Sequence, residues 1–469
     1  MTGPLCIVFD VGKTNKKVLV FDQHYRVLHE EQTPFEEITD DDGFRCDDLP
    51  RLTNWVLESY HKLMAQFGTA VRAVNASAYG ASLVHLGETG LPVTPLYNYL
   101  RDFPRDLHTQ FFEQYGPASE FFVQTASPDL GMLNSGLQLY WLKYAKPDVF
   151  ATIRHSLHLP QYVSYLLTQQ PVSEITSVGC HTALWDFVRR DYHSWTLNEG
   201  VHSIRQTPLQ SANTFAIHGD IQAGIGIHDS SAALVPYLKA FAGTDASADL
   251  APFVLLSTGT WSVSMNPFND EPLTPDELRQ DCLCYLSCEG RQVKSSRLFA
   301  GNEHERQIKH LAAYFQTDVN YYRQVRFDSN LVQSLRKRFR QLTPAETHLT
   351  GLRESPFVER NLNEYTTYEE AYHQFMLDLV AQQVASLSLA MGQTPLKALF
   401  VDGGFSRNDI FMNLLAEAYP DLKVQASKVA QASALGAALI IHEFWNPTAF
   451  DATCINLIPY STQVTGASL

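Results

Sequence analysis

The sequence has no long apolar run and few basic residues, and each absence excludes a class of protein. No uninterrupted apolar stretch approaches the roughly twenty residues that a membrane-spanning helix needs. The first residues, MTGPLC, have no basic segment ahead of an apolar one, which a secretory signal would have. The formal net charge is −15, which argues against nucleic acid or an anionic membrane as the main partner. We therefore expect a soluble, cytoplasmic protein.

Cysteine is also scarce and does not pair up. The seven cysteines are an odd number scattered along the chain, which suggests reduced thiols. Cys282, Cys284 and Cys288 lie close together in DCLCYLSCEG, but this segment lacks the paired CxxC spacing of a zinc site. Its residues alternate as in a strand, so buried core cysteines are favoured.

The length and composition predict a globular chain of two domains. The chain has 469 residues, and this length exceeds what one hydrophobic core usually supports. Its residues are 45% apolar and 18% charged, which is typical of a globular protein. The stretch TPLQSANTFAIHGDIQAGIG is rich in turn residues and lacks a strong period. We place the domain boundary within it, which gives domains of residues 1–218 and 219–469.

Helical and strand patterns alternate along the chain, which favours an α/β fold. Helical spacing predicts a helix over Asn134–Phe150 that ends near Pro147, and a long buried helix over Tyr368–Met391 that closes at Gly392. The segment ALFVDGG that follows reads as a strand, and IFMNLLAEAYP as the next helix.

The segment FDVGKTNKK contains Gly12-Lys13-Thr14, the end of a P-loop motif, but lacks the rest of it. A P-loop needs a glycine five positions before the Gly-Lys pair, and Ile7 stands there. The flanking runs CIVFD and KVLVFD are both rich in β-branched and aromatic residues, which predicts two strands. We therefore expect a β-hairpin with a glycine at its tip.

A second segment repeats this pattern. When FDVGKTNKKVLVFD is set over LSTGTWSVSMNPFN, Gly12 falls on Gly259 and Asn15 on Ser262. Two such hairpins, one from each domain, could hold phosphates between them with backbone N–H groups and hydroxyls. Any strand–turn–strand unit could give the same match, so the repeat alone leaves both interpretations open.

A third segment, LFVDGGFSRNDIFMNLLA, combines a strand, the glycines Gly403 and Gly404, a polar turn and a helix. Glycines let a backbone approach a ligand closely, and a helix N-terminus favours anions. In this order, the three segments resemble the phosphate-1, phosphate-2 and adenosine motifs of the actin and hexokinase superfamily. Together with GIGIHDSSAAL and ASALGAALI, they resemble the FGGY carbohydrate kinases over most of the chain.

The resemblance implies an α/β fold of two ribonuclease-H-like (actin-like ATPase) domains flanking a central cleft. It implies ATP and Mg²⁺ as cofactors and transfer of the γ-phosphoryl group to a hydroxyl of a small sugar. The GTWS of the second hairpin is similar to the rhamnulokinase and fuculokinase branch, which suggests L-rhamnulose or L-fuculose. Against this branch, Ser77 and Ser82 stand where an acidic residue is often found.

Several alternatives stay open beside this interpretation. The chain could be a kinase for a pentulose or a polyol. It could be an actin-like or Hsp70-like ATPase, or a sugar-binding regulator without catalysis. The expected partners are a sugar and ATP, with no nucleic acid and no membrane, and a homodimer stays open.

The resemblance also implies roles for single residues. Asp229 corresponds to the catalytic aspartate, although without the resemblance an aspartate before SSAA would be read as a helix cap. His228 beside it is expected to be structural. Asp10 is the candidate for Mg²⁺, which takes one or two carboxylates together with water and phosphate oxygens. Lys13 departs from the family's usual threonine and could face solvent instead.

The remaining candidates fall into two groups. The expected phosphate and nucleotide residues are Gly12, Lys13, Thr14, Asn15, Gly259, Thr260, Gly301, Gly403, Gly404 and Asn408. The expected sugar-binding residues are Tyr79, Gly80, Tyr99, Arg101, Asp102, His181 and Asp229. For the aromatic members, burial in the core is an equally good account.

Overall fold

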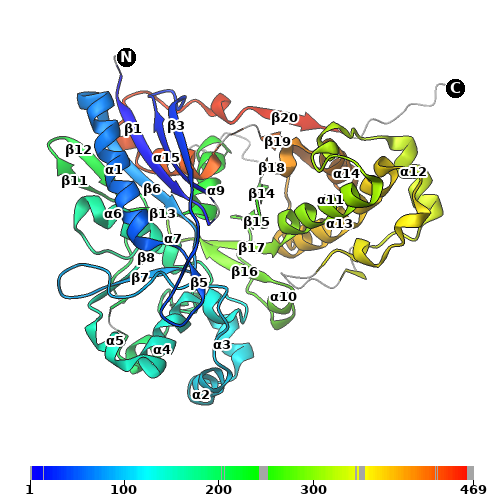
Figure 1. Cartoon of the computed structure of the whole chain (residues 1–469). Helices are drawn as coiled ribbons and strands as arrows, with labels where there is room; N and C mark the ends of the chain where they lie inside the picture. Colours follow the sequence, from blue (N-terminus) through cyan, green and yellow to red (C-terminus); the bar gives the residue numbers. More distant parts are fainter. Residues whose placement is uncertain are drawn as a thin grey trace.

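The computed structural model describes most of the chain and divides it between two lobes, each built around a sheet (Figure 1). The described residues are 3–13, 15–201, 203–204, 206–241, 252–343, 346–347, 354–427, 429 and 431–461. None of the helices within these ranges combines the length and apolar character of a membrane span.

The first sheet has the strand order β11-β12-β6-β1-β2-β3, and the short β13 also pairs with β6. The neighbours β1–β2, β2–β3 and β11–β12 are antiparallel, whereas β1–β6 and β6–β12 are parallel. The strands are β1 (Leu5–Val11), β2 (Asn15–Phe21), β3 (Val27–Pro34), β6 (Val71–Ala78), β11 (Thr214–His218), β12 (Ile221–Gly224) and β13 (Ile227–His228).

The second sheet repeats this topology. Its order is β16-β17-β15-β14-β18-β19-β20, in which β17–β15–β14 are antiparallel and β14–β18–β19 are parallel. The strands are β14 (Phe253–Thr258), β15 (Ser262–Asn266), β16 (Cys282–Leu286), β17 (Gln292–Leu298), β18 (Ala398–Gly403), β19 (Lys423–Ser427) and β20 (Leu457–Tyr460). The repeated order β3-β2-β1-β6-β12 and β17-β15-β14-β18-β19 confirms the internal repeat read from the sequence.

The side chains of β1 point alternately to the two faces of the first sheet, and helices cover both faces. Side chains of one parity, among them Ile7 and Phe9, pack under α1 (Leu49–Phe67) and α6 (Leu159–Thr168). The opposite parity, which includes Val8, packs against α9 (Asp229–Phe241) and α15 (Ala432–Ile440). Because strand side chains alternate with a period of two, Asp10 lies on the α15 side.

The helices α9 and α15 lie between the two sheets. Buried side chains of α9 contribute to the cores on both sides, with Ala232 and Val235 on the first sheet and Leu234 and Tyr237 on the second. A Cβ added to Gly436 of α15 would overlap the carbonyl oxygen of Ala232. The small residues of ASALGAALI thus allow the two helices to pack closely.

The outer face of the second sheet carries a helical layer (Figure 1). Its helices are α11 (Ala300–Phe315), α12 (Ser329–Arg338), α13 (Tyr368–Met391) and α14 (Asp409–Ala418). The bounds of α13 and its closure at Gly392 confirm the predicted long helix. Cys282 and Cys284 are buried in β16, as the strand pattern predicted, and all seven cysteines are free.

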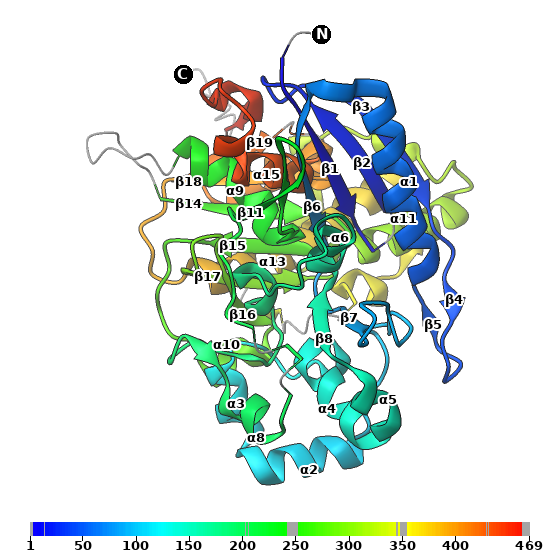
Figure 2. The same ribbon diagram turned by 90° about the vertical axis from the view of Figure 1, so that its left-hand side faces the viewer.

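A helical extension rich in aromatic residues lies below the first sheet (Figure 2). The predicted helix over Asn134–Phe150 is divided at Pro147, which opens a new helix because proline suits the first turn. The helices and strands of the described residues that have not yet been named, within this extension and outside it, are β4 (Ile38–Thr39), β5 (Arg45–Cys46), β7 (Leu83–Leu86), α2 (Arg105–Tyr115), α3 (Ala118–Gln124), α4 (Ser135–Ala145), α5 (Pro147–Thr152), β8 (His155–His158), α7 (Ile175–Val178), β9 (Trp185–Asp186), β10 (Asp191–Tyr192), α8 (Ser194–Asn198) and α10 (Pro275–Arg279).

The expected boundary between residues 218 and 219 falls inside a hairpin of the first sheet. It separates β11 from β12, which pair with each other, and β12 and β13 both pair with β6. The first sheet therefore continues to His228, past the expected boundary. A turn-rich sequence marks a hairpin and a domain junction in the same way, so composition alone could not separate them.

Candidate functional site

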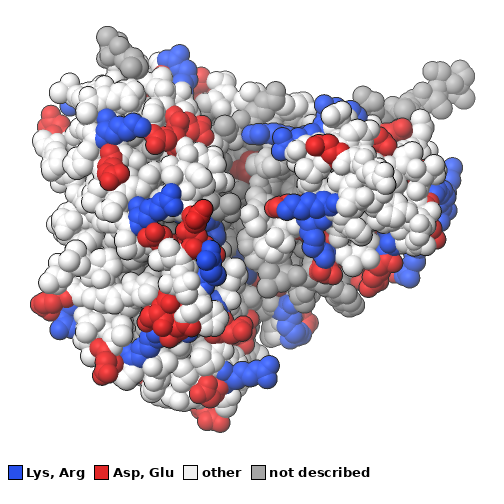
Figure 3. Space-filling view, in the orientation of Figure 1, with Lys and Arg blue, Asp and Glu red and all other residues white. Residues whose placement is uncertain are grey.

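A cavity of about 570 Å³ lies between the two lobes and is lined by residues of both. Figure 3 shows the surface hollowed along this line. The two hairpins, the start of α9, the end of β18 and the start of α15 all border the cavity.

The two glycine hairpins reach the cavity from opposite sheets, and in each of them the glycine N–H donates to a backbone carbonyl on the far side of the turn. The Gly12 N–H donates to the carbonyl of Asn15 at 2.9 Å, and the Gly259 N–H donates to the carbonyl of Trp261, also at 2.9 Å. The second strands begin at Asn15 and Ser262, the pair that the sequence alignment matched. Gly12, Lys13, Asn15, Gly259 and Thr260 all line the cavity. Thr14 lies outside the described residues.

The remaining glycine candidates support or border the second hairpin. Gly301 does not line the cavity, but a Cβ added to it would overlap the carbonyl oxygen of Gly259. Gly403 and Gly404 do line it, and the Gly404 N–H donates to the carbonyl of Thr258 at 2.9 Å. Gly403 has φ +77 and a Cβ there would overlap the Thr258 carbonyl, so this position requires glycine.

Asn408 lies outside the cavity lining. Its side chain accepts from the N–H of Phe411, which caps α14, and donates to the hydroxyl of Tyr372 at 2.7 Å. The motif residue thus fixes the helix that follows the double glycine.

Asp229 is the first residue of α9 and lines the cavity. Its Oδ1 accepts from the Ser230 N–H at 2.6 Å and the Ser230 hydroxyl at 3.3 Å, and lies 3.2 Å from Nε2 of His228. An N-cap side chain accepts from N–H groups two or three residues further on, so these contacts differ from those of a cap. Burial raises the pKa of Asp229 to about 6.

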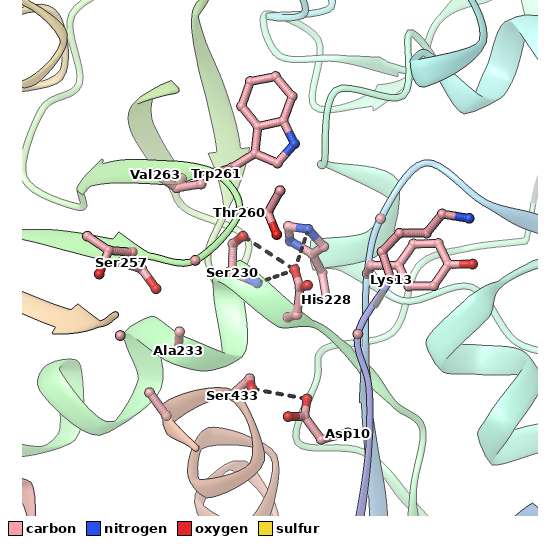
Figure 4. Close-up of a pocket in the computed structure, with 18 of the residues that line it drawn as sticks. Asp10, Lys13, His228, Ser230, Ala233, Ser257, Thr260, Trp261, Val263 and Ser433 are labelled. Carbon is pink, nitrogen blue, oxygen red and sulfur yellow. Dashed lines mark hydrogen bonds and ion pairs between the residues drawn. The ribbon is translucent and has the colours of Figure 1, made fainter. Parts of the chain in front are cut away.

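Two further carboxylates face the same cavity. Asp10 accepts from the hydroxyl of Ser433 at 3.0 Å (Figure 4), and burial, with a contribution from the charge of Asp229, raises the pKa of Asp10 to about 6. Burial also raises the pKa of Asp402, at the end of β18, to about 6. Asp10 and Asp402 thus offer oxygen ligands of the kind that a divalent cation takes, and a bound cation would favour their ionised forms.

Lys13 is held by a carboxylate rather than exposed to solvent. Its Nζ lies 2.6 Å from Oδ2 of Asp47, which also accepts from the hydroxyl of Tyr79 at 2.8 Å. The other oxygen of Asp47 accepts from the buried Lys16 at 2.8 Å. Although burial opposes ionisation, Lys13 and Lys16 hold the pKa of Asp47 below its usual range. This network ties the first hairpin to the wall that carries Tyr79.

The expected sugar-binding residues divide into two groups. Tyr79, Gly80, Tyr99 and His181 line the cavity together with Asp229. A Cβ on Gly80 would lie 2.8 Å from Sγ of Cys180 and 3.1 Å from Nε2 of His228, so the bare backbone is needed there.

Arg101 and Asp102 lie outside this lining. The guanidinium of Arg101 forms ion pairs with Asp40 at 3.2 Å and Asp42 at 2.6 Å and stacks on the ring of Trp141. Asp102 is exposed. The structure therefore places these two candidates away from the other sugar-binding candidates.

Several cavity residues were missed by the sequence analysis. Asp402 immediately precedes the double glycine, and this position at a strand end is a signal that could have identified it. Arg297 and Tyr285 line the cavity from the second lobe, but their sequence context is that of ordinary strand residues. Only the pairing of β15, β16 and β17 brings them together.

Known proteins share both the sequence pattern and the fold of this chain. Residues 5–211 match the N-terminal domain of the FGGY family of carbohydrate kinases, and residues 250–449 match the FGGY carbohydrate kinase C-terminal domain. A rhamnulokinase from Halalkalibacterium halodurans is 22% identical over 271 residues, 55% of this chain and 55% of that protein. The match thus spans about half the length of this curated relative.

Solved structures match over nearly the full length. A carbohydrate kinase from Novosphingobium aromaticivorans has a TM-score of 0.77 at 25% identity, covering 98% of this chain and 95% of that one. A xylulose kinase from Lactobacillus acidophilus has a TM-score of 0.76 at 16% identity, covering 98% and 93%. The two domain matches cover most of the sequence, and the chain belongs to the FGGY family of carbohydrate kinases.

Proposed function

We propose that this protein is an ATP-dependent sugar kinase that transfers the γ-phosphoryl group to a hydroxyl of a small ketose such as L-rhamnulose or L-fuculose. The observation that carries the proposal is the meeting of Asp229 with two glycine hairpins in one cavity. Phosphoryl transfer needs a base beside the attacking hydroxyl and donors around the phosphates, and this cavity offers both. The family membership supports the same reaction.

In the proposed reaction, Asp229 takes the proton of the sugar hydroxyl. Its Oδ1 faces Ser230 and His228, which leaves Oδ2 as the oxygen available to the substrate. Burial lowers the pKa of His228 to about 3, so this imidazole is neutral at pH 7 and positions the carboxylate without adding charge. The pKa of Asp229, about 6, suits a base that is ionised yet strong near neutral pH.

The hairpins hold the phosphates between the lobes. At Gly259 a Cβ would meet only the carbonyl of Trp261, at 3.8 Å, and at Gly404 it would meet nothing within 4 Å. These positions therefore face open space in which phosphate and nucleotide could lie. Thr260 adds a hydroxyl at the tip of the second hairpin, whereas the ammonium of Lys13 is paired with Asp47 and anchors the first hairpin.

Asp10, with Asp402 nearby, would hold Mg²⁺. When bound, the ion neutralises phosphate charge as it develops during transfer. Ser433 orients Asp10 by donating to Oδ1. The seven free cysteines support a reducing, cytoplasmic location for the reaction.

An assay of ADP release over ketoses, aldoses and polyols tests this function. We expect one sugar to stimulate ADP release strongly and to be recovered as its phosphate ester. Sugar-independent hydrolysis would instead indicate an actin-like or Hsp70-like ATPase. Sugar binding without turnover would indicate a regulator.

A further inference from the structure

Arg297 is a cation in the cavity wall that the sequence motifs do not predict. It lies on β17, where it pairs with Val263 of β15 and faces the interlobe side of the second sheet. Its side chain is only 5% exposed, yet it lines the cavity beside His181 and Tyr285. The guanidinium also lies 5.1 Å from the centre of the Trp261 ring, which fixes its plane.

The hydrogen bonds of Arg297 are incomplete. Its Nη2 donates to Oδ1 of Asp281 at 2.8 Å. Its Nε is buried and has no acceptor among the described residues, and Oδ2 of Asp281 likewise has no partner there. A guanidinium is always charged and carries five N–H donors, so one bond to Asp281 leaves most of the hydrogen-bonding capacity of Arg297 unused beside the cavity.

A second, partly buried arginine outside the cavity lining shows a complete ion pair of this chain. Arg360 donates from Nε to Oδ2 of Asp378 at 2.5 Å and from Nη2 to Oδ1 at 2.7 Å. That bidentate pair uses both donors on one edge of the guanidinium. Arg297 instead uses a single nitrogen on Asp281, and its guanidinium lines the cavity, so other donors of the same group are left for a ligand there.

We propose that Arg297 is the residue with which the C-terminal lobe recognises the substrate, and that it binds a sugar oxygen that only accepts hydrogen bonds. Such an oxygen is the carbonyl of an open-chain ketose or the carboxylate of a sugar acid. A hydroxyl facing the all-donor guanidinium would still need an acceptor for its own hydrogen. Arg297 therefore favours carbonyl and carboxylate substrates over polyols. This inference rests on the proposed kinase function and narrows its substrate class.

Matched substrates test the inference. Wild-type protein is assayed with L-rhamnulose, L-fuculose and D-xylulose, with the polyols of the same carbon chains, and with the corresponding aldonates. Binding of each compound is also measured by calorimetry. We expect kcat/KM for a ketose or an aldonate to exceed that for its polyol by about a hundredfold. The ketose and aldonate arms decide which oxygen Arg297 binds. Equal use of ketose and polyol would overturn the inference.

The variants separate recognition from folding. Arg297→Gln should raise the sugar KM by about tenfold to a hundredfold, with KM for ATP within threefold of wild type. Arg297→Lys keeps a cation beside Asp281 but removes the planar set of guanidinium donors, so it should fold like wild type and still lose sugar affinity. Arg336→Gln is the matched control, because Arg336 makes one 2.8 Å contact to Glu417 on the surface, and its sugar KM should not change.

Two results would overturn the inference in distinguishable ways. A folded Arg297→Lys variant with the sugar KM and dissociation constant of wild type would reduce Arg297 to a structural ion pair, while the kinase proposal stands. If wild type phosphorylates and binds none of the compounds, the proposed function and the inference both fail.

Discussion

Gly301 packs so closely against the carbonyl oxygen of Gly259 that a Cβ on Gly301 would overlap it. The first turn of α11 thus supports the tip of the second hairpin, and the Asn302 N–H donates to the carbonyl of Thr260 at 3.3 Å. Gly301 does not itself line the cavity, so any effect it has on the proposed phosphate site would act through the hairpin.

Gly301→Ala should therefore displace the second hairpin. Overpacking of this kind destabilises a fold by about 1–3 kcal/mol, and we expect the KM for ATP to rise about tenfold or more. The control is Asn302→Ala, which changes an exposed side chain at the next position. A Gly301→Ala variant with wild-type ATP kinetics would show that ATP use does not depend on the position of the second hairpin.

Gly259→Val should act on the same site without disturbing the fold. A Cβ there has only an ordinary contact, 3.8 Å from the Trp261 carbonyl, so the melting temperature should stay near that of wild type. The side chain would occupy phosphate space, which should raise the KM for ATP and lower kcat while sugar binding is retained. Unchanged ATP kinetics in the folded variant would remove this hairpin from the phosphate site.

Asp47→Asn should destabilise the first lobe. Lys16 is 1% exposed and its Nζ lies 2.8 Å from Asp47, and breaking a buried ion pair costs about 3–5 kcal/mol. Glu31→Gln is the control, because Glu31 pairs with Lys62 on the surface at 2.7 Å and such pairs contribute less than about 1 kcal/mol. Denaturant unfolding measures both variants. Equal, small effects would contradict the buried network.

Much of the fold could be predicted from the sequence because it depends on local patterns. The long, mostly apolar segment that closes at Gly392 identified α13, and the paired β-branched runs identified the hairpin of β1 and β2. Gly12 and Gly259 were found because a hairpin tip has a local composition that recurs in both halves of the chain.

The rest of the site depends on long-range pairing. Asp47 is the residue before the N-cap of α1. It contacts Lys13 and Lys16 only because the hairpin of β1 and β2 places both lysines beside it. Arg101 was expected to bind the sugar, but its guanidinium is paired with Asp40 and Asp42. Short-range periodicity carries no information on such partners.

The pKa of Asp229 predicts how activity and stability depend on pH. Because burial raises this pKa to about 6, kcat/KM should fall about tenfold per unit below pH 6 as the base becomes protonated. The folded state holds this proton more tightly than the unfolded chain does, so the group stabilises the fold below its unfolded pKa of about 3.9 and loses that contribution as pH rises through 6.

Asp229→Asn removes the buried charge and should therefore melt at or above the wild-type temperature at pH 7.5. This gain should shrink between pH 6 and pH 4, where the wild-type carboxyl becomes neutral. Thermal unfolding of both proteins across this range is the measurement. A variant that is less stable at pH 7.5 would show that the ionised carboxylate is favoured by the fold.

The kcat of Asp229→Asn, measured with the sugar that wild type phosphorylates, tests the central claim most directly. Asparagine keeps the shape and the acceptor oxygen toward Ser230 but cannot take the hydroxyl proton. A general base contributes about 10² to 10⁴ in rate, so we predict a kcat at least about a hundredfold below wild type, with ATP and sugar binding retained by calorimetry. A variant that turns over its sugar within a few-fold of wild type would contradict the assignment of Asp229 as the catalytic base.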